Sequence, residues 1–501
     1  MSADAAVTAY RPARRRAARG VSGRVAAVMT VSLTVSGIAL LVLPDDFLAL
    51  AAPLLANVNI AVLYTTILLF KDRQVPVFEI GSLWVAATLI YASFPFLGFM
   101  AGGMNWTPNM DLRLQQYPFV TSEIVWFAWQ LTMYFAAFVV AYLLVRRSAA
   151  VPVKVFNPIR ANTAGALLIV FAALLAVEWG LYFVYGISMN TSHDHAEIMA
   201  NIARINRLPL LVWQISGHML EAMTLGEMGV AILLLTQWRK RPWTRVVLVL
   251  WLASEVALLV VRGSARSPVV ILLLTIGLLY HRLVRPFSVK AVAIGTAAFL
   301  TSFVVLGIVR VHSDTPRSIN VRTALTNANE FQVLFSTAFD LYQRKQLGTL
   351  GTVPWQVRAI DLYLVIPRQL LPFEKIDPSV WYLEVIGFKD SGIGFMFGVL
   401  AQSVVGLGWI ELVLRGALLG VVFGLLHRWY VKRALRLWPT MLYVFLSIWS
   451  FYTFRATSFW FVHFIVFQFI PFLAATKLIE MALQNVRDRP AGKRREIAAT
   501  A

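Results

Sequence analysis

Long apolar stretches alternate with short polar ones along most of the chain. Several windows run for about 18 residues or more with almost no charge, which is the length an α-helix needs to cross a bilayer. The pattern therefore predicts an all-α polytopic membrane protein with about twelve transmembrane helices. The expected spans cover residues 25–44, 47–70, 77–100, 122–145, 163–185, 211–237, 244–261, 268–281, 291–310, 409–427, 440–455 and 459–476.

Composition supports this fold class. Of the 501 residues, 59% are hydrophobic and 14% are charged, and the mean hydropathy is +0.70. A soluble globular chain carries about 25% charged residues. The chain has no cysteine, which excludes disulfides, thiolate metal ligands and a cysteine nucleophile.

A net charge of +20 raises the question of a nucleic-acid partner. Most basic residues lie in short clusters that alternate with pairs of apolar spans, which is the positive-inside pattern of membrane proteins. We therefore expect no nucleic-acid partner, both termini in the cytoplasm, and basic cytoplasmic tails at residues 1–24 and 477–501. The run after the first tail is longer than the apolar core of a secretory signal, so we expect a retained first span. The clusters are Arg11–Arg24, Lys71–Arg73, Arg146–Arg160, Arg239–Arg245, Arg282–Lys290, Arg428–Arg436 and Lys477–Arg495.

One long segment interrupts the alternation. Residues 311–408 separate the nine spans of 25–310 from the three of 409–476, and the expected topology places this segment outside. Loops beyond about 12–15 residues are usually functional or disordered. Asn329–Gln343 has apolar residues at helical spacing, with Phe331, Leu334, Phe335 and Phe339 on one face, so we expect a helical external (periplasmic) cap. The glycine-rich end, Gly392–Gly408, could be a re-entrant or interfacial segment.

The stretch "VVRGSARSPVV" (Val260–Val270) places Arg262 and Arg266 between apolar runs. The following span is short, about 21 Å long at 1.5 Å per residue, so it should begin below the outer membrane edge. Ser267 as N-cap and Pro268 at the first helical position would suit a helix start. A helix N-terminus flanked by arginines is an anion site. The alternative is an anchor loop whose arginines reach lipid headgroups.

Other ionisable residues divide into those near the outer edge and those within spans. Arg310, His312, Arg317, Arg322, Arg368, Lys375, Arg415 and Arg455 are the basic candidates. Arg415 lies within a span, where a charge is costly, and Glu411 one turn earlier is an alternative partner. Carboxylates within spans are functional hypotheses unless they pair with buried arginines, and His218 and Glu221 are expected to pair with each other. The span carboxylates are Glu79, Glu178, Glu221, Glu227 and Glu255, and those of the cap are Glu330, Asp340, Asp361, Glu374 and Asp377.

Motifs of several soluble enzyme classes are missing. The sequence has no HExxH, Walker A, GxSxG or GxGxxG pattern, which disfavours metalloproteases, ATPases and serine hydrolases. "HDHAE" (His193–Glu197) could ligate a metal, although a solvated turn is the simpler interpretation. We therefore expect no metal site and no cofactor.

The chain resembles the bacterial O-antigen (oligosaccharide repeat-unit) polymerases of the Wzy type, within the C-type glycosyltransferase superfamily. The resemblance rests on "VVRGSARSPVVILLLTIGLL", on the long external loop before the last three spans, and on "NEFQVLFSTAFDLY", "IPRQLLPFEKIDPSVWYL" and "GFMFGVLAQSVVGLGWIELVLRGALLG". The spacing of Arg262 and Arg266 differs from the tighter Gly-Ser-Arg-Ser form of some members.

The resemblance implies an enzyme that transfers a growing glycan en bloc from undecaprenyl diphosphate to the non-reducing end of a new lipid-linked repeat unit. The reaction would take place at the periplasmic face of the bacterial inner membrane, without a metal and with membrane lipids, a flippase and a chain-length regulator as partners. Fixed positive charge would stabilise the leaving diphosphate, and a carboxylate or histidine would deprotonate the acceptor. The expected diphosphate ligands are Arg262, Arg266, Arg310, Arg322 and Arg368, the expected bases are Glu330 and then His312, and the expected glycan contacts are Glu374, Asp377, Trp381 and Tyr382, with Trp355 as a further flat face.

Three alternatives stay open, one of them a structural scaffold of an envelope complex, for which Arg262 would be dispensable. An O-antigen ligase would use the same donor and transfer the glycan to a lipid A core. A transporter of polysaccharides or lipid-linked oligosaccharides would instead place its ionisable residues along a central path, whereas here they gather at the outer edge.

Overall fold

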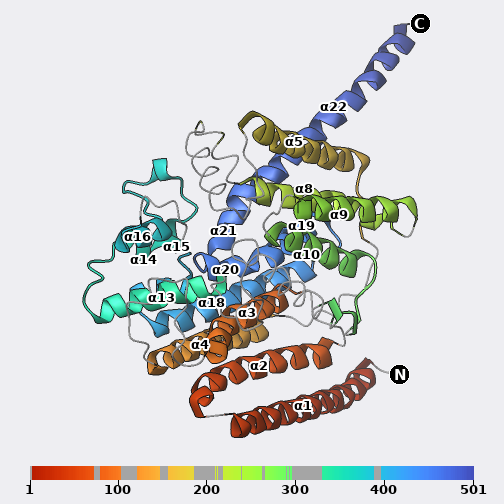
Figure 1. Cartoon of the computed structure of the whole chain (residues 1–501). Helices are drawn as coiled ribbons and strands as arrows, with labels where there is room; N and C mark the ends of the chain where they lie inside the picture. Colours follow the sequence, from red (N-terminus) through yellow and green to blue (C-terminus); the bar gives the residue numbers. More distant parts are fainter. Residues whose placement is uncertain are drawn as a thin grey trace.

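The computed structural model of the chain describes residues 3–43, 45–72, 79–102, 121–146, 156–185, 218–238, 240–261, 266–288, 330–388 and 396–500, with short pieces at 209, 212, 290–292 and 294–295. Every regular element in this described part is helical (Figure 1). The chain therefore has the all-α architecture that its hydrophobic pattern predicts. The long helices are α1 (Ala3–Val42), α2 (Asp45–Asp72), α3 (Ile80–Gly102), α4 (Thr121–Val145), α5 (Ala161–Tyr185), α8 (Met219–Thr236), α9 (Trp243–Val261), α10 (Arg266–Leu283), α13 (Glu330–Gln346), α18 (Trp409–Val431), α19 (Leu437–Ile448) and α22 (Ile470–Thr500).

Six of the described helices are long and apolar enough to cross a membrane. Their membrane-length stretches are Gly23–Val42, Leu48–Phe70, Ser122–Val145, Ala161–Leu181, Trp409–Val431 and Trp460–Val486. Shorter apolar helices cover Ile80–Ser93, Trp243–Ser254 and Val270–Leu283. These nine segments coincide with expected spans, and they make the chain a helical protein suited to a membrane. The full count of twelve stays a prediction, because most of the ninth expected span lies outside the described residues.

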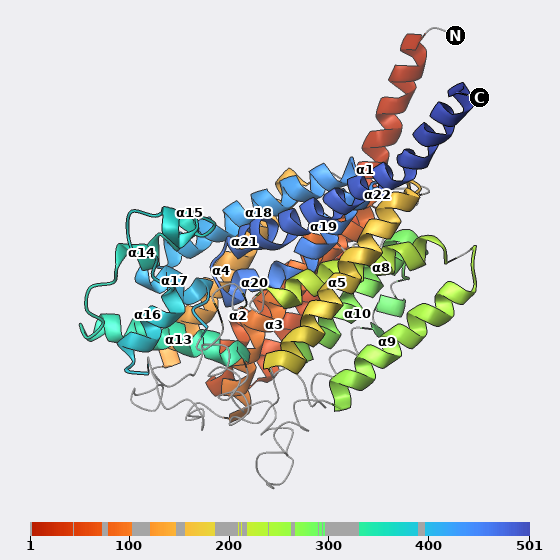
Figure 2. The same cartoon turned by 90° about the horizontal axis from the view of Figure 1, so that it is seen from above.

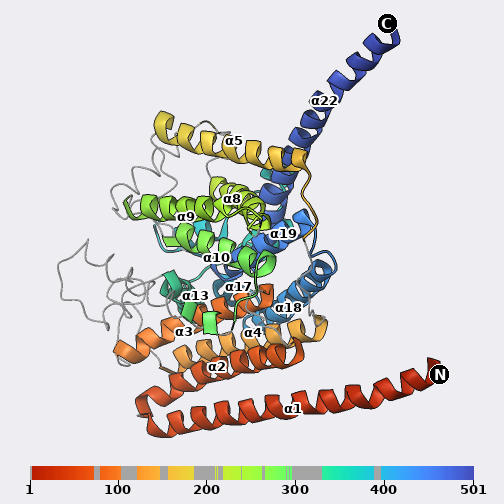
Figure 3. The same cartoon turned by 90° about the vertical axis from the view of Figure 1, so that its right-hand side faces the viewer.

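The long helices are arranged side by side in layers. In Figures 1 and 3, α1 lies at one edge and α5 near the other, with α18 and α19 between them. Adjacent helices pack along this order, including α1 on α2, α2 on α4, α4 on α18, α10 on α8, and α8 on α5. The aromatic core includes Trp84 of α3 stacked on Phe138 of α4, with ring centroids 3.5 Å apart. The bundle therefore has a continuous apolar interior that reaches from α2 to α22.

Three glycines set the closest helix pair, α18 on α4. Gly416, Gly420 and Gly424 recur every four residues on one face of α18. A Cβ added at Gly416 or Gly420 would collide with the backbone carbonyl oxygen of Tyr134 or Phe138 on α4. Small residues at this spacing let two membrane helices approach closely, and dispersion contacts then hold them together.

The eleventh expected span is not one continuous α-helix, which corrects the prediction for residues 440–455. The α-helix α19 ends at Ile448 and is followed by a 3₁₀ turn and the short helix α20 (Tyr452–Arg455). Buried hydroxyls in this stretch bond to nearby backbone carbonyls, including Ser450 Oγ to Ser447 O and Thr453 Oγ1 to Ser450 O, both at 2.8 Å. Such bonds compete with the helical ladder and favour a local change of geometry.

Residues 330–388 and 396–405 form a group of helices at one end of the molecule, away from both chain termini (Figure 2). We call this group the cap. Besides α13 it contains α14 (Trp355–Arg358), α15 (Ile360–Tyr363), a 3₁₀ turn (Arg368–Leu370), α16 (Pro378–Val385) and α17 (Val399–Val405). The described residues of the segment predicted between 311 and 408 are thus helical, and their position outside the membrane stays a prediction.

The helix α13 is amphipathic, as its sequence predicts. Leu334, Phe335 and Phe339 are buried, and the ring of Phe335 meets that of Phe96 on α3 edge-on, with centroids 5.4 Å apart. The side chain of Phe331 lies outside the described residues. One apolar face of α13 therefore fixes the cap to the bundle.

A buried ion pair joins the ends of α3 and α4. Glu79 Oε1 lies 2.6 Å from Nη2 of Arg146, and the Tyr142 hydroxyl donates to Glu79 Oε2 at 3.0 Å. Glu79 is one of the carboxylates predicted within spans. Its partner is a buried arginine, and such a pair was the expected alternative to a functional role. Its role is therefore to hold helix ends together.

Candidate functional site

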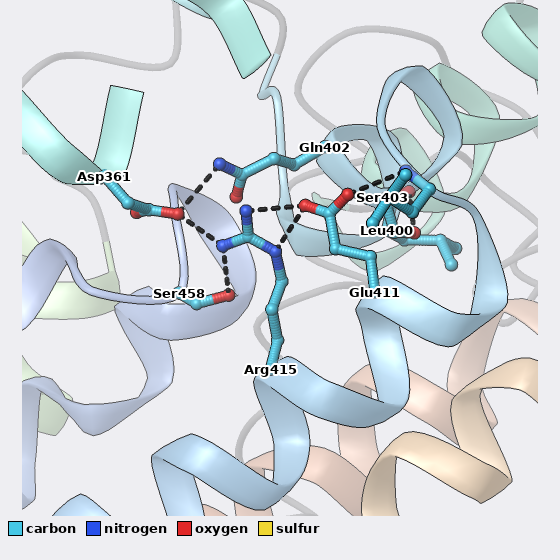
Figure 4. A network of polar contacts seen from close by, with 8 residues as sticks. Asp361, Leu400, Gln402, Ser403, Glu411, Arg415 and Ser458 are labelled. Carbon is cyan, nitrogen blue, oxygen red and sulfur yellow. Dashed lines mark hydrogen bonds and ion pairs between the residues drawn. The ribbon is translucent and has the colours of Figure 1, made fainter. Parts of the chain in front are cut away.

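The cap and the bundle meet at a buried polar cluster centred on Arg415, in the second turn of α18 (Figure 4). The guanidinium contacts two carboxylates. Its Nε donates to Glu411 Oε1 at 2.7 Å, one helical turn earlier, and its Nη1 forms an ion pair with Asp361 of α15. Nη1 also lies 3.3 Å from Ser458 Oγ, in the segment between α20 and α21 (Trp460–Phe464). The pair of Arg415 with Glu411, offered by helical spacing as an alternative to a functional role, forms, and Asp361 adds a second partner from the cap.

Two glycines between α17 and α18 make this cluster possible. Gly408 has φ of 71° and precedes α18, a left-handed conformation that glycine adopts without a steric penalty. A Cβ at Gly406 would collide with the carboxylate of Glu411. Glu411 therefore folds back over the turn, where its Oε2 accepts from the backbone N–H of Leu407 at 2.8 Å.

Gln402 of α17 completes the cluster. Its Nε2 donates to Asp361 Oδ2 at 2.9 Å. Asp361 Oδ1 and Gln402 Oε1 are buried without a hydrogen-bond partner in the described part of the protein. Since Arg415 is matched by two carboxylates, it has no spare charge for a diphosphate, and its geometry makes it the residue that ties α15 to α18.

The exposed surface of the cap carries two of the predicted substrate residues. Arg368 and Glu374 lie 3.3 Å apart, and their side chains are 69% and 71% exposed. An ion pair in water contributes little to stability and leaves both groups accessible. Arg368 therefore remains available to an anionic or polyhydroxyl ligand.

Three other predicted glycan contacts have structural contacts in the cap. Asp377 is the N-cap of α16, and its Oδ1 accepts from the backbone N–H of Ser379 at 2.7 Å. Trp381 and Tyr382 are buried, and the Tyr382 hydroxyl donates to Asp340 Oδ2 at 2.9 Å. Neither ring offers the open flat face that sugar stacking requires. The sequence signal for the capping role of Asp377 is the Asp-Pro-Ser start of α16, which is typical of a capped helix.

An aromatic group with one exposed member lies beside the Arg368–Glu374 pair in the sequence. The Trp355 ring packs edge-on against Phe373 and Tyr363, with centroids 4.6 and 6.1 Å away. Trp355 is 52% exposed. Trp355 therefore combines a large ring with wide exposure, unlike the buried Trp381 and Tyr382.

Two titratable groups hold this part of the cap together. Lys375 is half-buried, and its Nζ donates to the backbone oxygens of Leu364 and Ile366 at 2.7 and 3.1 Å. Desolvation lowers the pKa of Lys375, and the nearby Asp377 carboxylate opposes that shift. Burial raises the pKa of the Tyr363 hydroxyl to about 12, and that hydroxyl donates to the backbone oxygen of Gln356.

Several predicted diphosphate ligands and bases lie outside the described residues. Two others open helices whose first side chains are not described: Arg266 begins α10, and Glu330 begins α13. The start of α10 corrects the predicted boundary, because the helix includes Ser267 and Pro268 and Ser267 is not the N-cap. A proline is tolerated here because the first helical N–H groups have no intrahelical acceptor. The residues outside are Arg262, Arg310, His312 and Arg322, and so is the segment His193–Glu197.

The expected pair of His218 and Glu221 does not form, which corrects that prediction. His218 contacts Gln468 through its Nδ1 at 2.9 Å, and Glu221 Oε2 is buried without a hydrogen-bond partner among the described residues. Gln468 lies in a π-helical turn (Ile465–Phe469), and the histidine His463 is close by. The contact between His218 and Gln468 was not predicted from the sequence, because no spacing rule links two positions that are 250 residues apart.

No three histidine, aspartate or glutamate side chains in the described ranges come together as ligands for one metal ion. Comparisons of the chain with protein-family models, with curated proteins and with solved structures return no match.

Proposed function

We propose that the protein is a membrane glycosyltransferase that polymerises oligosaccharide repeat units carried on undecaprenyl diphosphate. The growing glycan is transferred from its lipid diphosphate to the non-reducing-end hydroxyl of a new lipid-linked repeat. Undecaprenyl diphosphate is released at the outer face of the bacterial inner membrane. The resemblance to repeat-unit polymerases in the sequence motifs is the source of this assignment.

The cap is the observation that carries the proposal. It is a polar and aromatic helical layer attached to one end of an apolar bundle, on the side away from both termini (Figure 2). A lipid-linked glycan has the same division, because its polyprenyl chain is apolar and its sugars and diphosphate are polar. The buried contact of Arg415 with Asp361 holds the two layers together, as an enzyme acting on such a substrate requires.

The chemistry of the leaving group favours a basic site at this boundary. Negative charge develops on the diphosphate as its bond to the sugar breaks, and fixed guanidinium groups stabilise that charge. Arg262 and Arg266 flank the start of α10 in the sequence, and Arg368 is exposed on the cap. We assign Arg262 and Arg266 as the main diphosphate ligands, with Arg310, Arg322 and Arg368 as supporting ones.

A base must also remove the proton of the acceptor hydroxyl. General bases of this kind contribute about 10²–10⁴-fold to a rate. The sequence offers Glu330, the first residue of α13, and His312. Glu374 and Trp355 on the exposed cap surface are suited to hold the sugars.

The proposal is tested with the purified full-length protein in phospholipid vesicles that contain lipid-linked repeat units from the cells that carry the gene. Polymerisation gives a ladder of longer lipid-linked glycans without a nucleotide sugar. If single repeats cross the bilayer and no ladder forms, the protein is a transporter. If the glycan appears only on added lipid A core, the protein is a ligase.

A further inference from the structure

A second polar group lies between α8 and the segment α21–α22. Nδ1 of His218, at the start of α8, is 2.9 Å from the side-chain amide of Gln468. The ring of His463 on α21 lies 5.3 Å from that of His218, centroid to centroid. Gln468 is buried, whereas His218 is half-buried and can be reached from outside. The three side chains come from two parts of the chain that pack together only in the fold.

The environment of Gln468 fixes which way its amide points. In the orientation that satisfies both ends, the nitrogen donates to the backbone oxygens of His463 and Phe464 at 3.0 and 3.1 Å, and the oxygen accepts from His218 Nδ1. The opposite orientation would bring the amide oxygen against two carbonyl oxygens. A hydrogen bond to one ring nitrogen selects the tautomer of a neutral histidine. His218 therefore carries its proton on Nδ1 and presents the lone pair of Nε2.

The local backbone supports a functional role for Gln468. Residues Ile465–Phe469 form a π-helical turn within the otherwise α-helical segment from Trp460 to Thr500. Such turns are rare, cost helical regularity and are frequent at functional sites. Here the turn places Gln468 against His218.

The group lies beneath the cap. Trp460 stacks on His463 with centroids 4.8 Å apart, and Trp460 also packs against the buried cluster of Ile360, Tyr363 and Leu364 in the cap. Lys375 of the cap is close enough to act electrostatically on His463. The histidine group therefore lies next to the cap, which is the part of the protein proposed to hold the glycan.

We propose that His218, in place of Glu330 or His312, is the general base of the transfer reaction and that Gln468 is its positioning residue. This inference rests on the proposed function. The acceptor O–H bond breaks, and its proton moves to Nε2 of His218. The oxygen forms a bond to the anomeric carbon of the donor glycan, and the bond from that carbon to the diphosphate oxygen breaks. Undecaprenyl diphosphate leaves with the electron pair, and the imidazolium later returns its proton to water.

Ionisable residues lie on the elements that pack around His218. Glu221 follows one turn later on α8. Lys375 of the cap acts electrostatically on His463, the neighbour of His218. His463 faces His218 from α21. The helix α10, which packs along α8, begins at Arg266. The base works only when neutral, so the rate falls as pH decreases through the titration of His218.

The first test compares chain elongation by wild type and His218→Gln in the vesicle assay across the pH range. We expect the substitution to lower the rate by about 10²–10⁴-fold and to abolish the acidic limb of the profile. His281→Gln, which alters a histidine at the other end of α10, should keep both the rate and the limb. If His218→Gln elongates chains at the wild-type rate, the base assignment alone is overturned. If the wild-type protein elongates no chains, the polymerase proposal itself is overturned.

The second test separates positioning from folding. In Gln468→Glu, one carboxylate oxygen still accepts from Nδ1–H and stabilises the imidazolium, so the acidic limb should move to higher pH. The other oxygen replaces the N–H donor that faces the carbonyls of His463 and Phe464, so the overall rate should also fall. In Gln468→Leu, the rate should fall and the tautomer preference of His218, read from ¹⁵N histidine NMR, should be lost. If both variants keep the wild-type profile and tautomer, Gln468 does not position His218 and the inference is wrong.

Discussion

Arg415 in the second turn of α18 forms an ion pair with Asp361 in α15 of the cap (Figure 4). The two residues are 54 positions apart in the sequence. The same guanidinium also contacts Glu411 at 2.6 Å. The charge that appears most costly in the sequence of α18 therefore ties α15 of the cap to the bundle.

Arg415→Met should destabilise the protein strongly. It leaves the buried carboxylates of Asp361 and Glu411 without a counter-charge, and breaking a buried pair in this way costs about 3–5 kcal/mol. The midpoint of thermal unfolding in detergent measures the loss. Arg368→Ala, in the cap, is the control. Its arginine is in an exposed pair, so the substitution should change stability by about 1 kcal/mol or less. Equal midpoints for the two variants would contradict the proposed attachment.

Gly420→Ala should weaken the packing of α18 on α4. The added methyl group would meet the carbonyl oxygen of Phe138 and the Cβ of Ala141, and overpacking of this kind costs about 1–3 kcal/mol. Gly277→Ala in α10 is the control, because nothing lies within 4 Å of the added atom. There the higher helix propensity of alanine should be neutral or favourable. Thermal unfolding of both variants compares them, and a Gly420→Ala protein as stable as Gly277→Ala would argue against close packing at this point.

The orientation of the cap can be tested directly because the chain has no cysteine. Leu362→Cys introduces a thiol at a cap position that is 84% exposed. Lys240→Cys introduces one at an exposed position between α8 and α9. If the cap faces outward and basic loops face inward, a membrane-impermeant maleimide should label the first variant in intact spheroplasts. It should label the second only after permeabilisation. The reverse pattern would invert the expected topology.

Much of the helical architecture follows from the sequence because the apolar runs are long and their period is clear. The amphipathic face of α13 was predicted, and Leu334, Phe335 and Phe339 are buried. The interruption after Ile448 was not, because hydropathy does not reveal how Ser450 and Thr453 bond to the backbone. Local hydrogen bonding competes with the helix without changing the apolar pattern.

The candidate site is less accessible from the sequence. Helical spacing offered Glu411 as an alternative partner of Arg415, whereas Asp361 and Gln468 find their partners only through tertiary packing. Aromatic and acidic residues of the cap looked equally suited to sugars. Exposure separates them, because Trp355 is accessible and Tyr382 is buried against Asp340.

The most direct test of the account is chain elongation by the Arg262→Ala and Arg266→Ala variants, alone and combined, in vesicles with lipid-linked repeat units. Loss of a group that stabilises developing charge lowers a rate by about 10²–10³-fold. We predict a ladder of longer glycans from wild type, a loss of that size in at least one single variant, and no ladder from the double variant. A wild-type ladder from the double variant would contradict the assignment of these arginines to the diphosphate. Absence of any ladder from the wild-type protein would contradict the polymerase function.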